Sequence, residues 1–362
     1  MATGIDISGL TLNPLEVQEI QSFIIEQVFS RPDLMAIHGI QTGVTMKEQI
    51  VFASQFGKTG IKGDSTCTRK TSGAESVVTQ KYWEPVGIED TLIHCNKELN
   101  ALFKAYFLKI QKYRDNYEIE GTDLQIFFSI LMLETIQSTI WRAAWFGDTS
   151  VAVAGVAAAG LVLAGDVKFY DYLDGLWLQI FAGVTATDIE RVTITENAIT
   201  TSKADQLVLA SSTAAIDYFK AIKAKADPRL RSNPDAQLLV NREIYDNYVD
   251  YLVDNSIVYT VELTQTGLPS VKWDAYTVVN METVWNVDAR EDFLNNTTDN
   301  VYDLPHRIVF TAPANIPIGT LNESDFTELE MWYEQKEREN NLAYGFSLDA
   351  KLLEEYLIVV AY

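Results

Sequence analysis

Apolar residues recur at helical spacing in several segments of the first half of the chain. Residues 15–29, 99–110 and 124–144 each place large apolar side chains three or four positions apart. The third segment follows Thr122, whose three-residue offset to Gln125 fits a capping box. We therefore predict a long helix over 122–146 with apolar side chains on more than one face, which neighbouring elements should cover on several sides.

The second half of the chain mixes helical and strand patterns. Ser211-Ser212 could cap a helix that carries Ile216, Phe219 and Ile222 and that Pro228 stops. A further helix is predicted from Asn241 to Leu252, and strands are predicted at 238–240, 271–279, 308–310 and 356–361. This order shows neither a regular alternation of strands and helices nor an internal repeat. It predicts an α+β fold.

Two segments differ from the rest in composition. Residues 56–78 carry four glycines among Lys, Thr and Ser, so they cannot build a core and are predicted to form an extended hairpin or a loop. Residues 150–165 are uncharged and rich in Ala and Gly. They are shorter than the roughly 20 residues that a membrane span needs. We interpret them as a buried or interface segment.

Composition narrows the class of protein. The chain has 362 residues with a formal net charge of −22, and 47% of its residues are hydrophobic. Such a chain is expected to fold around a packed core. The charge argues against a general binder of nucleic acid or anionic membranes, because that binding needs clustered cations. The first ten residues lack the basic and apolar regions of a secretory signal, so none is expected.

Charge is distributed unevenly along the chain. Residues 1–150 carry a net charge of −5, and residues 151–362 carry −17. The acidic half nevertheless contains the one dense basic patch of the sequence, formed by Lys220, Lys223, Lys225, Arg229 and Arg231. An exposed helix face would explain it, and so would contact with the acidic surface of a neighbouring subunit or with phosphate.

Candidate catalytic and metal-binding residues are few. His38, His94 and His306 stand in no zinc-binding or catalytic motif, and neither Cys67 nor Cys95 has a metal-ligand partner close by in sequence. The segment Asp171 to Gly175 lacks the alternating acidic positions of a calcium loop and is predicted to be a turn. Phosphate-binding and nucleophile-elbow motifs are absent. We expect no cofactor, no metal and two reduced thiols.

One acidic cluster offers an alternative, enzymatic hypothesis. Acidic side chains follow one another closely near Trp285, and paired carboxylates can hydrolyse glycosidic bonds at suitable separations. The cluster comprises Glu282, Asp288, Glu291 and Asp292. A solvated acidic loop explains the same residues, so we assign no catalytic role to them.

The order of these segments resembles that of the major capsid proteins of tailed bacteriophages, which have the Hong Kong 97-type shell fold. The resemblance covers nearly the whole chain. It rests on the N-terminal segment, the Gly- and Thr-rich loop, Tyr82-Trp-Glu-Pro85, Trp141 to Asp148 at the end of the long helix, Leu173 to Leu176, Pro305 to Phe310, Ala314 to Gly319, Met331 to Gln335 and Glu355 to Tyr362.

The resemblance implies a division of the chain into an arm, a loop and two domains. Residues 1–55 would form the N-terminal arm and residues 56–92 the E-loop. The peripheral domain would comprise 93–165 and 305–362, with its spine helix at 122–146, and 166–304 would form the axial domain. An arm and a loop with little core of their own gain burial only on a neighbouring copy.

The resemblance also implies the function and partners. The chain would self-assemble into hexamers and pentamers of an icosahedral head that encloses double-stranded DNA, together with portal, scaffold and decoration proteins. It would be made in the host cytoplasm and reside in the virion capsid. An encapsulin-like nanocompartment shell remains an alternative, as does the acidic soluble hydrolase.

We expect four residues to contact neighbouring copies: Lys70, Trp83, Lys223 and Arg229. Some relatives join their subunits covalently through an E-loop lysine. Four lysines lie in or near the loop, but none aligns with that role, so we assign no crosslink to Lys58, Lys62, Lys70 or Lys81.

Overall fold

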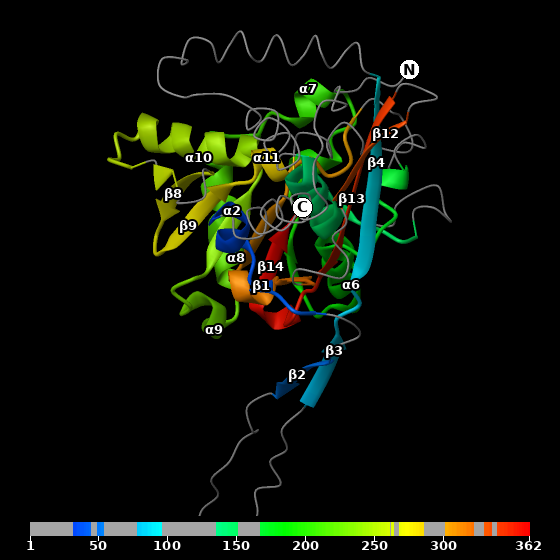
Figure 1. The fold of residues 1–362 in the computed structure, drawn as a ribbon. Helices are drawn as coiled ribbons and strands as arrows, with labels where there is room; N and C mark the ends of the chain where they lie inside the picture. Colours follow the sequence, from blue (N-terminus) through cyan, green and yellow to red (C-terminus); the bar gives the residue numbers. More distant parts are fainter. Residues whose placement is uncertain are drawn as a thin grey trace, which may run out of the picture.

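The computed structural model describes three β-sheets and the helices that cover them (Figure 1). The described residues are 32–44, 49–53, 78–95, 135–150, 167–260, 262–263, 268–285, 301–321, 329–334 and 339–362. Strands and helices are mixed without a regular βαβ repeat, so the predicted α+β class is confirmed.

A seven-stranded sheet forms the centre of the described part, in the order β5-β14-β10-β6-β9-β8-β7. Its strands are β5 (Glu190–Val192), β14 (Ile358–Ala361), β10 (Ile308–Thr311), β6 (Gln237–Val240), β9 (Tyr276–Asn280), β8 (Pro269–Trp273) and β7 (Glu262–Leu263). The pairs β5–β14 and β6–β9 are parallel and the other neighbouring pairs antiparallel. Segments distant in sequence therefore meet in one sheet.

The central strands of this sheet are buried on both faces. Alternate residues of a strand point to opposite faces. On β6, Leu238 and Val240 enter one apolar core and Leu239 enters another. The same alternation separates Val278 from Val279 on β9. Burial on both faces explains why these strands appear in the sequence as short, continuous apolar runs.

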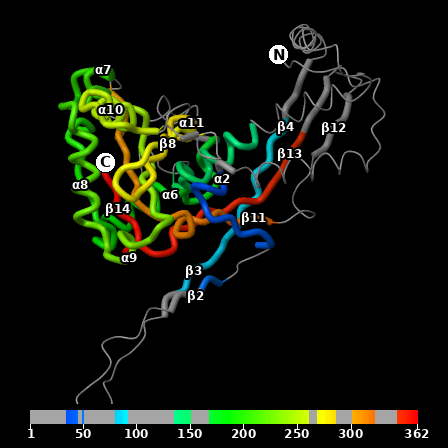
Figure 2. The backbone as a smooth tube through the Cα atoms, turned by 90° about the vertical axis from the view of Figure 1, so that its left-hand side faces the viewer, coloured from blue at the N-terminus to red at the C-terminus, as the bar shows by residue number. Residues whose placement is uncertain are grey.

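Helices cover each face of the central sheet (Figure 2). The first face packs against α8 (Ala214–Lys225) and α10 (Arg242–Asp254), whose buried side chains share a core with Leu238. The second face packs against the helical residues 135–146 and α6 (Leu176–Ala186), which share a core with Leu239. The result is a three-layer arrangement.

A second sheet extends away from these layers. Strand β13 (Glu339–Ala350) pairs along its length with β4 (Val86–Cys95), and Figure 2 shows the two strands leaving the body side by side. On its other edge β13 pairs first with β12 (Leu329–Glu334) and then with β11 (Ile318–Thr320). Strand β1 (Ile40–Gln41) joins β11 in parallel.

The third sheet is a two-stranded ladder formed by β2 (Gln49–Ala53) and β3 (Val78–Tyr82). The pair is antiparallel, and its last matched residues are Ala53 and Val78. Both strands lead into residues 54–77, which lie outside the described residues. The described ends of the predicted hairpin segment are therefore paired.

Short elements complete the described part. The helices are α2 (Pro32–Ile37), α7 (Lys203–Gln206), α9 (Pro228–Arg231) and α11 (Glu282–Trp285). Single 3-10 turns are η2 (Val167–Phe169), η3 (Thr195–Ala198), η4 (Pro313–Asn315) and η5 (Glu355–Leu357).

Several predicted elements are confirmed. The strand predicted at 238–240 is β6, the helix predicted from Asn241 is α10, and the C-terminal part of the long helix is seen at 135–146. The predicted stretch 271–279 is two strands, β8 and β9, joined by a turn in which Asp274 has a φ of 55°. Asp tolerates this left-handed conformation better than most residues.

The predicted cap of α8 was wrong. Thr213 occupies the N-cap position and makes no side-chain capping bond, while the Ser211 hydroxyl accepts a hydrogen bond from the Thr213 amide at 3.3 Å. The helices predicted at 15–29 and 99–110, the capping box at Thr122 and most of the small-residue segment 150–165 fall outside the described residues. In the part that the structure covers, each helix is too short or too polar to traverse a bilayer.

The end of the long helix is fastened to the start of α6. The Gly175 amide donates to the Gly147 carbonyl at 2.9 Å, and the Asp148 amide donates to the Tyr170 carbonyl at 2.9 Å. A Cβ atom on Gly147 would lie 2.3 Å from the Leu173 carbonyl oxygen, so only glycine fits this close approach of two backbones. The described residues on either side of 151–166 are thereby held together.

Candidate assembly surface

The chain that leaves the β2–β3 ladder is anchored to the body by Trp83 and its neighbours. The Trp83 side chain is completely buried, and two of its ring atoms lie 2.8 Å from where a Cβ on Gly319 would be. The Glu84 amide donates to the buried Asp349 carboxylate at 2.7 Å. Trp83 therefore fixes the base of the hairpin from within the subunit and exposes no surface to a neighbouring copy.

Lys81 adds a polar anchor on β3. Its ammonium group donates to the Leu352 carbonyl at 2.7 Å and to the Glu355 carboxylate at 2.5 Å. The two ionic side chains are about one-third exposed, so solvent weakens their attraction. The lysine holds the ladder against the turn that precedes β14.

Replacing Lys81 with Met is expected to loosen the ladder with little loss of global stability. The apolar stem is kept while both hydrogen bonds are lost, which should lower the free energy of unfolding by about 1 kcal/mol. Hydrogen exchange should rise in β3 and remain unchanged in β6. Unchanged exchange in β3 would show that Lys81 does not anchor the hairpin.

His38 joins α2 to the long helix. Its ring is fully buried between Trp141 and Trp145, with ring-centre distances of 5.4 and 5.5 Å. The Trp145 indole N–H donates to His38 Nε2 at 3.2 Å, so Nδ1 must carry the proton and donate to the Ile316 carbonyl at 2.7 Å. The neutral His38 ring thus links the end of α2, the long helix and the segment at Ile316 through its two hydrogen bonds.

Burial lowers the pKa of His38 to about 4, although the hydrogen bond to Ile316 opposes part of this shift. An unfolded histidine has a pKa of about 6.5. The unfolded chain therefore binds the proton more readily, and the stabilising contribution is present above pH 6.5 and is lost as the pH falls toward 4.

We expect the free energy of unfolding of the wild type to fall by about 3 kcal/mol more than that of His38→Gln between pH 7 and pH 4. Glutamine does not titrate, so the difference between the two proteins isolates His38 from the carboxylates that titrate in the same range. Urea unfolding at a series of pH values measures it. Parallel pH profiles would contradict the buried neutral histidine.

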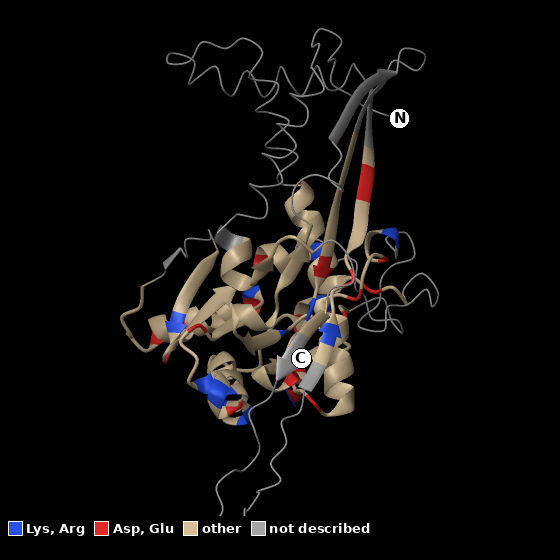
Figure 3. Ribbon diagram, turned by 60° about the horizontal axis from the view of Figure 1, so that its bottom comes forward, with Lys and Arg blue, Asp and Glu red and all other residues tan. Residues whose placement is uncertain are grey.

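The basic residues expected at an interface have partners within the subunit. Lys223 pairs with Asp274 in the turn between β8 and β9. Arg229 pairs with Asp227 at 3.0 Å, and its guanidinium lies 4.1 Å from the ring centre of Tyr356. Lys70 lies outside the described residues. Figure 3 shows basic and acidic residues interspersed along the described ribbon.

Of the acidic cluster considered for hydrolysis, only Glu282 and the neighbouring Trp285 lie among the described residues. Trp285 is buried and packs edge-on against Trp145 and Trp177 at 5.1 and 5.4 Å between ring centres. Glu282 accepts a hydrogen bond from Arg242 at 3.0 Å. The remaining acidic residues, Asp288, Glu291 and Asp292, lie outside the described residues.

The other titratable candidates have structural surroundings. His306 is buried, and its Nε2 lies 2.7 Å from the Gln206 carbonyl oxygen. His94 and Cys95 are on β4, and Cys67 lies outside the described residues. Within the described ranges, no three His, Cys, Asp or Glu residues gather in a way that could hold a metal ion.

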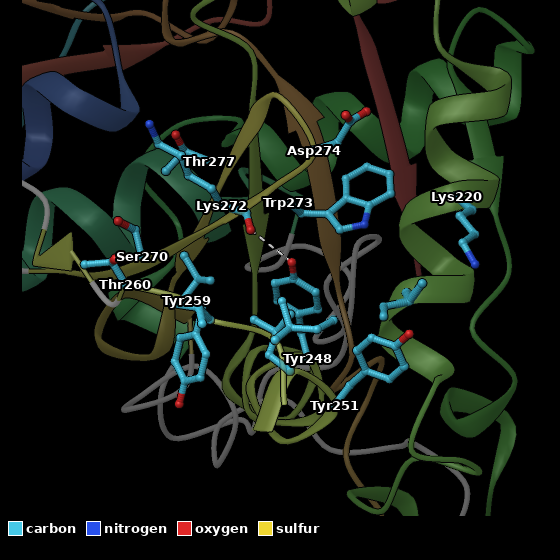
Figure 4. A pocket seen from close by; sticks show the side chains of 15 residues that line it. Lys220, Tyr248, Tyr251, Tyr259, Thr260, Ser270, Lys272, Trp273, Asp274 and Thr277 are labelled. Atoms are coloured by element: carbon cyan, nitrogen blue, oxygen red, sulfur yellow. Dashed lines mark hydrogen bonds between the residues drawn. The ribbon is translucent and has the colours of Figure 1, made fainter. Parts of the chain in front are cut away.

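A groove that the sequence did not reveal lies between α8, α10 and the β8–β9 hairpin (Figure 4). Its volume is about 540 Å³. Four aromatic side chains line it, and the Tyr248 hydroxyl is fixed by donation to the Lys272 carbonyl at 2.9 Å. The aromatic residues are Tyr248, Tyr251, Tyr259 and Trp273. They come from three separate segments, so no local pattern could group them.

Comparisons with known proteins give a match in fold only. No protein-family model matches the sequence, and no curated protein matches it. The structure resembles a chain of the satellite phage P4 procapsid, with a TM-score of 0.50 and 12% identity over 94% of this chain and 97% of that one.

Two further solved structures resemble the chain less closely. A capsid chain of a native GTA particle has a TM-score of 0.46 and 10% identity over 91% of this chain and 89% of that one. The SrpI encapsulin of Synechococcus elongatus PCC 7942 has a TM-score of 0.43 and 8% identity over 91% and 86% of the two chains.

The resemblance to the P4 procapsid chain runs through nearly the full length of both chains. The described architecture is consistent with it, since a mixed body carries a long strand pair on one side and a paired hairpin base on another. The chain therefore has the Hong Kong 97-type shell fold of the major capsid proteins of tailed bacteriophages.

Proposed function

We propose that the chain is a structural major capsid protein whose hexamers and pentamers build an icosahedral head around double-stranded DNA. The observation that carries this proposal is the shell fold, which spans 94% of the chain. The P4 procapsid, which supplies that likeness, is itself an assembled shell. The proposed location is the virion capsid, after synthesis in the host cytoplasm.

The proposed division of the chain into an arm, a loop and two domains is the one expected from the sequence. Residues 1–55 form the arm, 56–92 the E-loop, 93–165 and 305–362 the peripheral domain, and 166–304 the axial domain. The anchored base of the hairpin supports this division, because Trp83 and Lys81 hold the two ladder strands at a fixed place on the body. A fixed base would present the loop to a neighbouring copy in one orientation.

The excess of acidic over basic residues supports a shell that encloses DNA. A net charge of −22 gives the shell little attraction for phosphate, so a packaged duplex could slide during filling and release. Portal, scaffold and decoration proteins are proposed partners of such a head.

Particles purified from cells that produce the chain with its phage partners should protect DNA from added nuclease. A sucrose gradient separates the particles, and nucleic acid is extracted after nuclease treatment. Protected double-stranded DNA is the expected result. Particles that hold only protein would overturn the genome role and favour a nanocompartment of the encapsulin type.

A further inference from the structure

Two lysines stand apart from the others in the described part of the chain. Eight lysines lie there, and six have an acidic or aromatic partner: Lys81 with Glu355, Lys168 with Phe169, Lys203 with Tyr302, Lys223 with Asp274, Lys225 with Glu190 and Lys351 with Asp349. Lys220 and Lys272 have no such partner among the described residues. Both are exposed, in a chain where acidic residues outnumber basic ones by 22.

Lys220 and Lys272 line the same groove. Figure 4 shows that Lys220 and Lys272 lie on opposite sides of the aromatic pair Trp273 and Tyr248. Lys220 comes from α8, and Lys272 from β8. We call this the lysine groove; its lining includes the two lysines, the four aromatic residues named above, and Ile257 and Val258. Asp274 also lines it, and the Asp274 carboxylate is paired with Lys223.

The rim of the lysine groove exposes apolar side chains. Val258 is 97% exposed and Ile257 is 44% exposed, and both line the groove. Val253, at the end of α10, is 54% exposed. Adjacent exposed apolar residues beside a concave aromatic surface are typical of a binding surface.

We propose that the lysine groove receives an acidic segment, with an apolar or aromatic anchor, from a second copy of this chain. Charge complementarity supports this occupant. A copy carries 50 acidic residues against 28 basic ones, and among the described lysines Lys220 and Lys272 are the two without an acidic or aromatic partner. The aromatic floor would bury the anchor while the lysines fix its register.

The inference rests on the proposed shell function, because it names the surface through which copies associate. Association should depend on Lys220 and Lys272 and not on Arg231, a nearby basic residue outside the groove. Since charge pairs at the rim of an interface are screened by salt, the difference in association between the wild type and a charge-reversed groove variant should shrink as ionic strength rises.

Charge reversal tests the groove with a matched control. Lys272→Glu and Lys220→Glu each change the net charge by two, and so does Arg231→Glu, which lies on α9 outside the groove. We expect either groove variant to weaken association about tenfold or more in sedimentation velocity, and Arg231→Glu to match the wild type. Circular dichroism establishes that all three variants are folded.

A photo-crosslinking amino acid at Val258 identifies the occupant. The expected product is a covalent dimer in which position 258 of one copy joins an acidic segment of the other. If the wild type forms particles but the groove variants assemble equally well, or position 258 crosslinks only within its own chain or to an unrelated protein, the groove assignment is overturned and the shell function stands. If the wild type never associates, both proposals are overturned.

Discussion

Replacing residues 54–77 with an Asn-Gly turn is expected to abolish assembly while leaving the subunit folded. Strands β2 and β3 end at the matched pair Ala53 and Val78, so a two-residue turn can close the ladder without disturbing its register. The anchors at Lys81 and Trp83 remain. The loop proposed to reach a neighbouring copy is removed, while the N-terminal arm and the lysine groove are kept.

Light scattering and thermal unfolding measure the two halves of this prediction. The variant should stay at the mass of a single subunit under conditions where the wild type forms particles, and its melting temperature should stay within a few degrees of the wild type. Normal particles from the variant would refute the assignment of the loop as an assembly element.

Gly147→Ala is expected to be the most destabilising single methyl addition in the described part. The new Cβ would lie 2.3 Å from the Leu173 carbonyl oxygen and 2.7 Å from that of Ala143, and both are backbone atoms that cannot rotate away. The backbones must separate, which would also strain the hydrogen bond from the Gly175 amide to the Gly147 carbonyl. A loss of about 3 kcal/mol in the free energy of unfolding follows.

Gly87→Ala provides the matched control. A Cβ on Gly87 meets no atom within 4 Å, so the same chemical change should alter the free energy of unfolding by less than about 0.5 kcal/mol. Urea denaturation of the two variants and the wild type gives the comparison. Equal stability of Gly147→Ala and Gly87→Ala would show that the two backbones do not approach as closely as described.

Local patterns predicted the elements whose buried side chains lie close together in sequence. On α10, Ile244, Tyr248 and Leu252 are buried and recur every four residues, so their spacing alone predicted the helix. Strand β6 is buried on both faces, and its short apolar run predicted it equally well. The order of such segments also carried the resemblance to the shell fold.

Contacts between distant residues could not be predicted in this way. The ion pair of Lys223 is one example, because Asp274, its partner, lies 51 positions away in sequence. Trp83 was expected to contact a neighbouring copy, and its burial within the subunit depends on Gly319 of β11, which leaves room for its ring. The lysine groove was missed for the same reason, because it exists only where α8, α10 and β8 meet.

Electron microscopy of the negatively stained, purified protein, with light scattering on the same sample, tests the central claim most directly. We expect rings with five-fold or six-fold symmetry, tubes or closed shells. A single monodisperse species near 40.7 kDa at every concentration, and also in the presence of its phage partners, would contradict it.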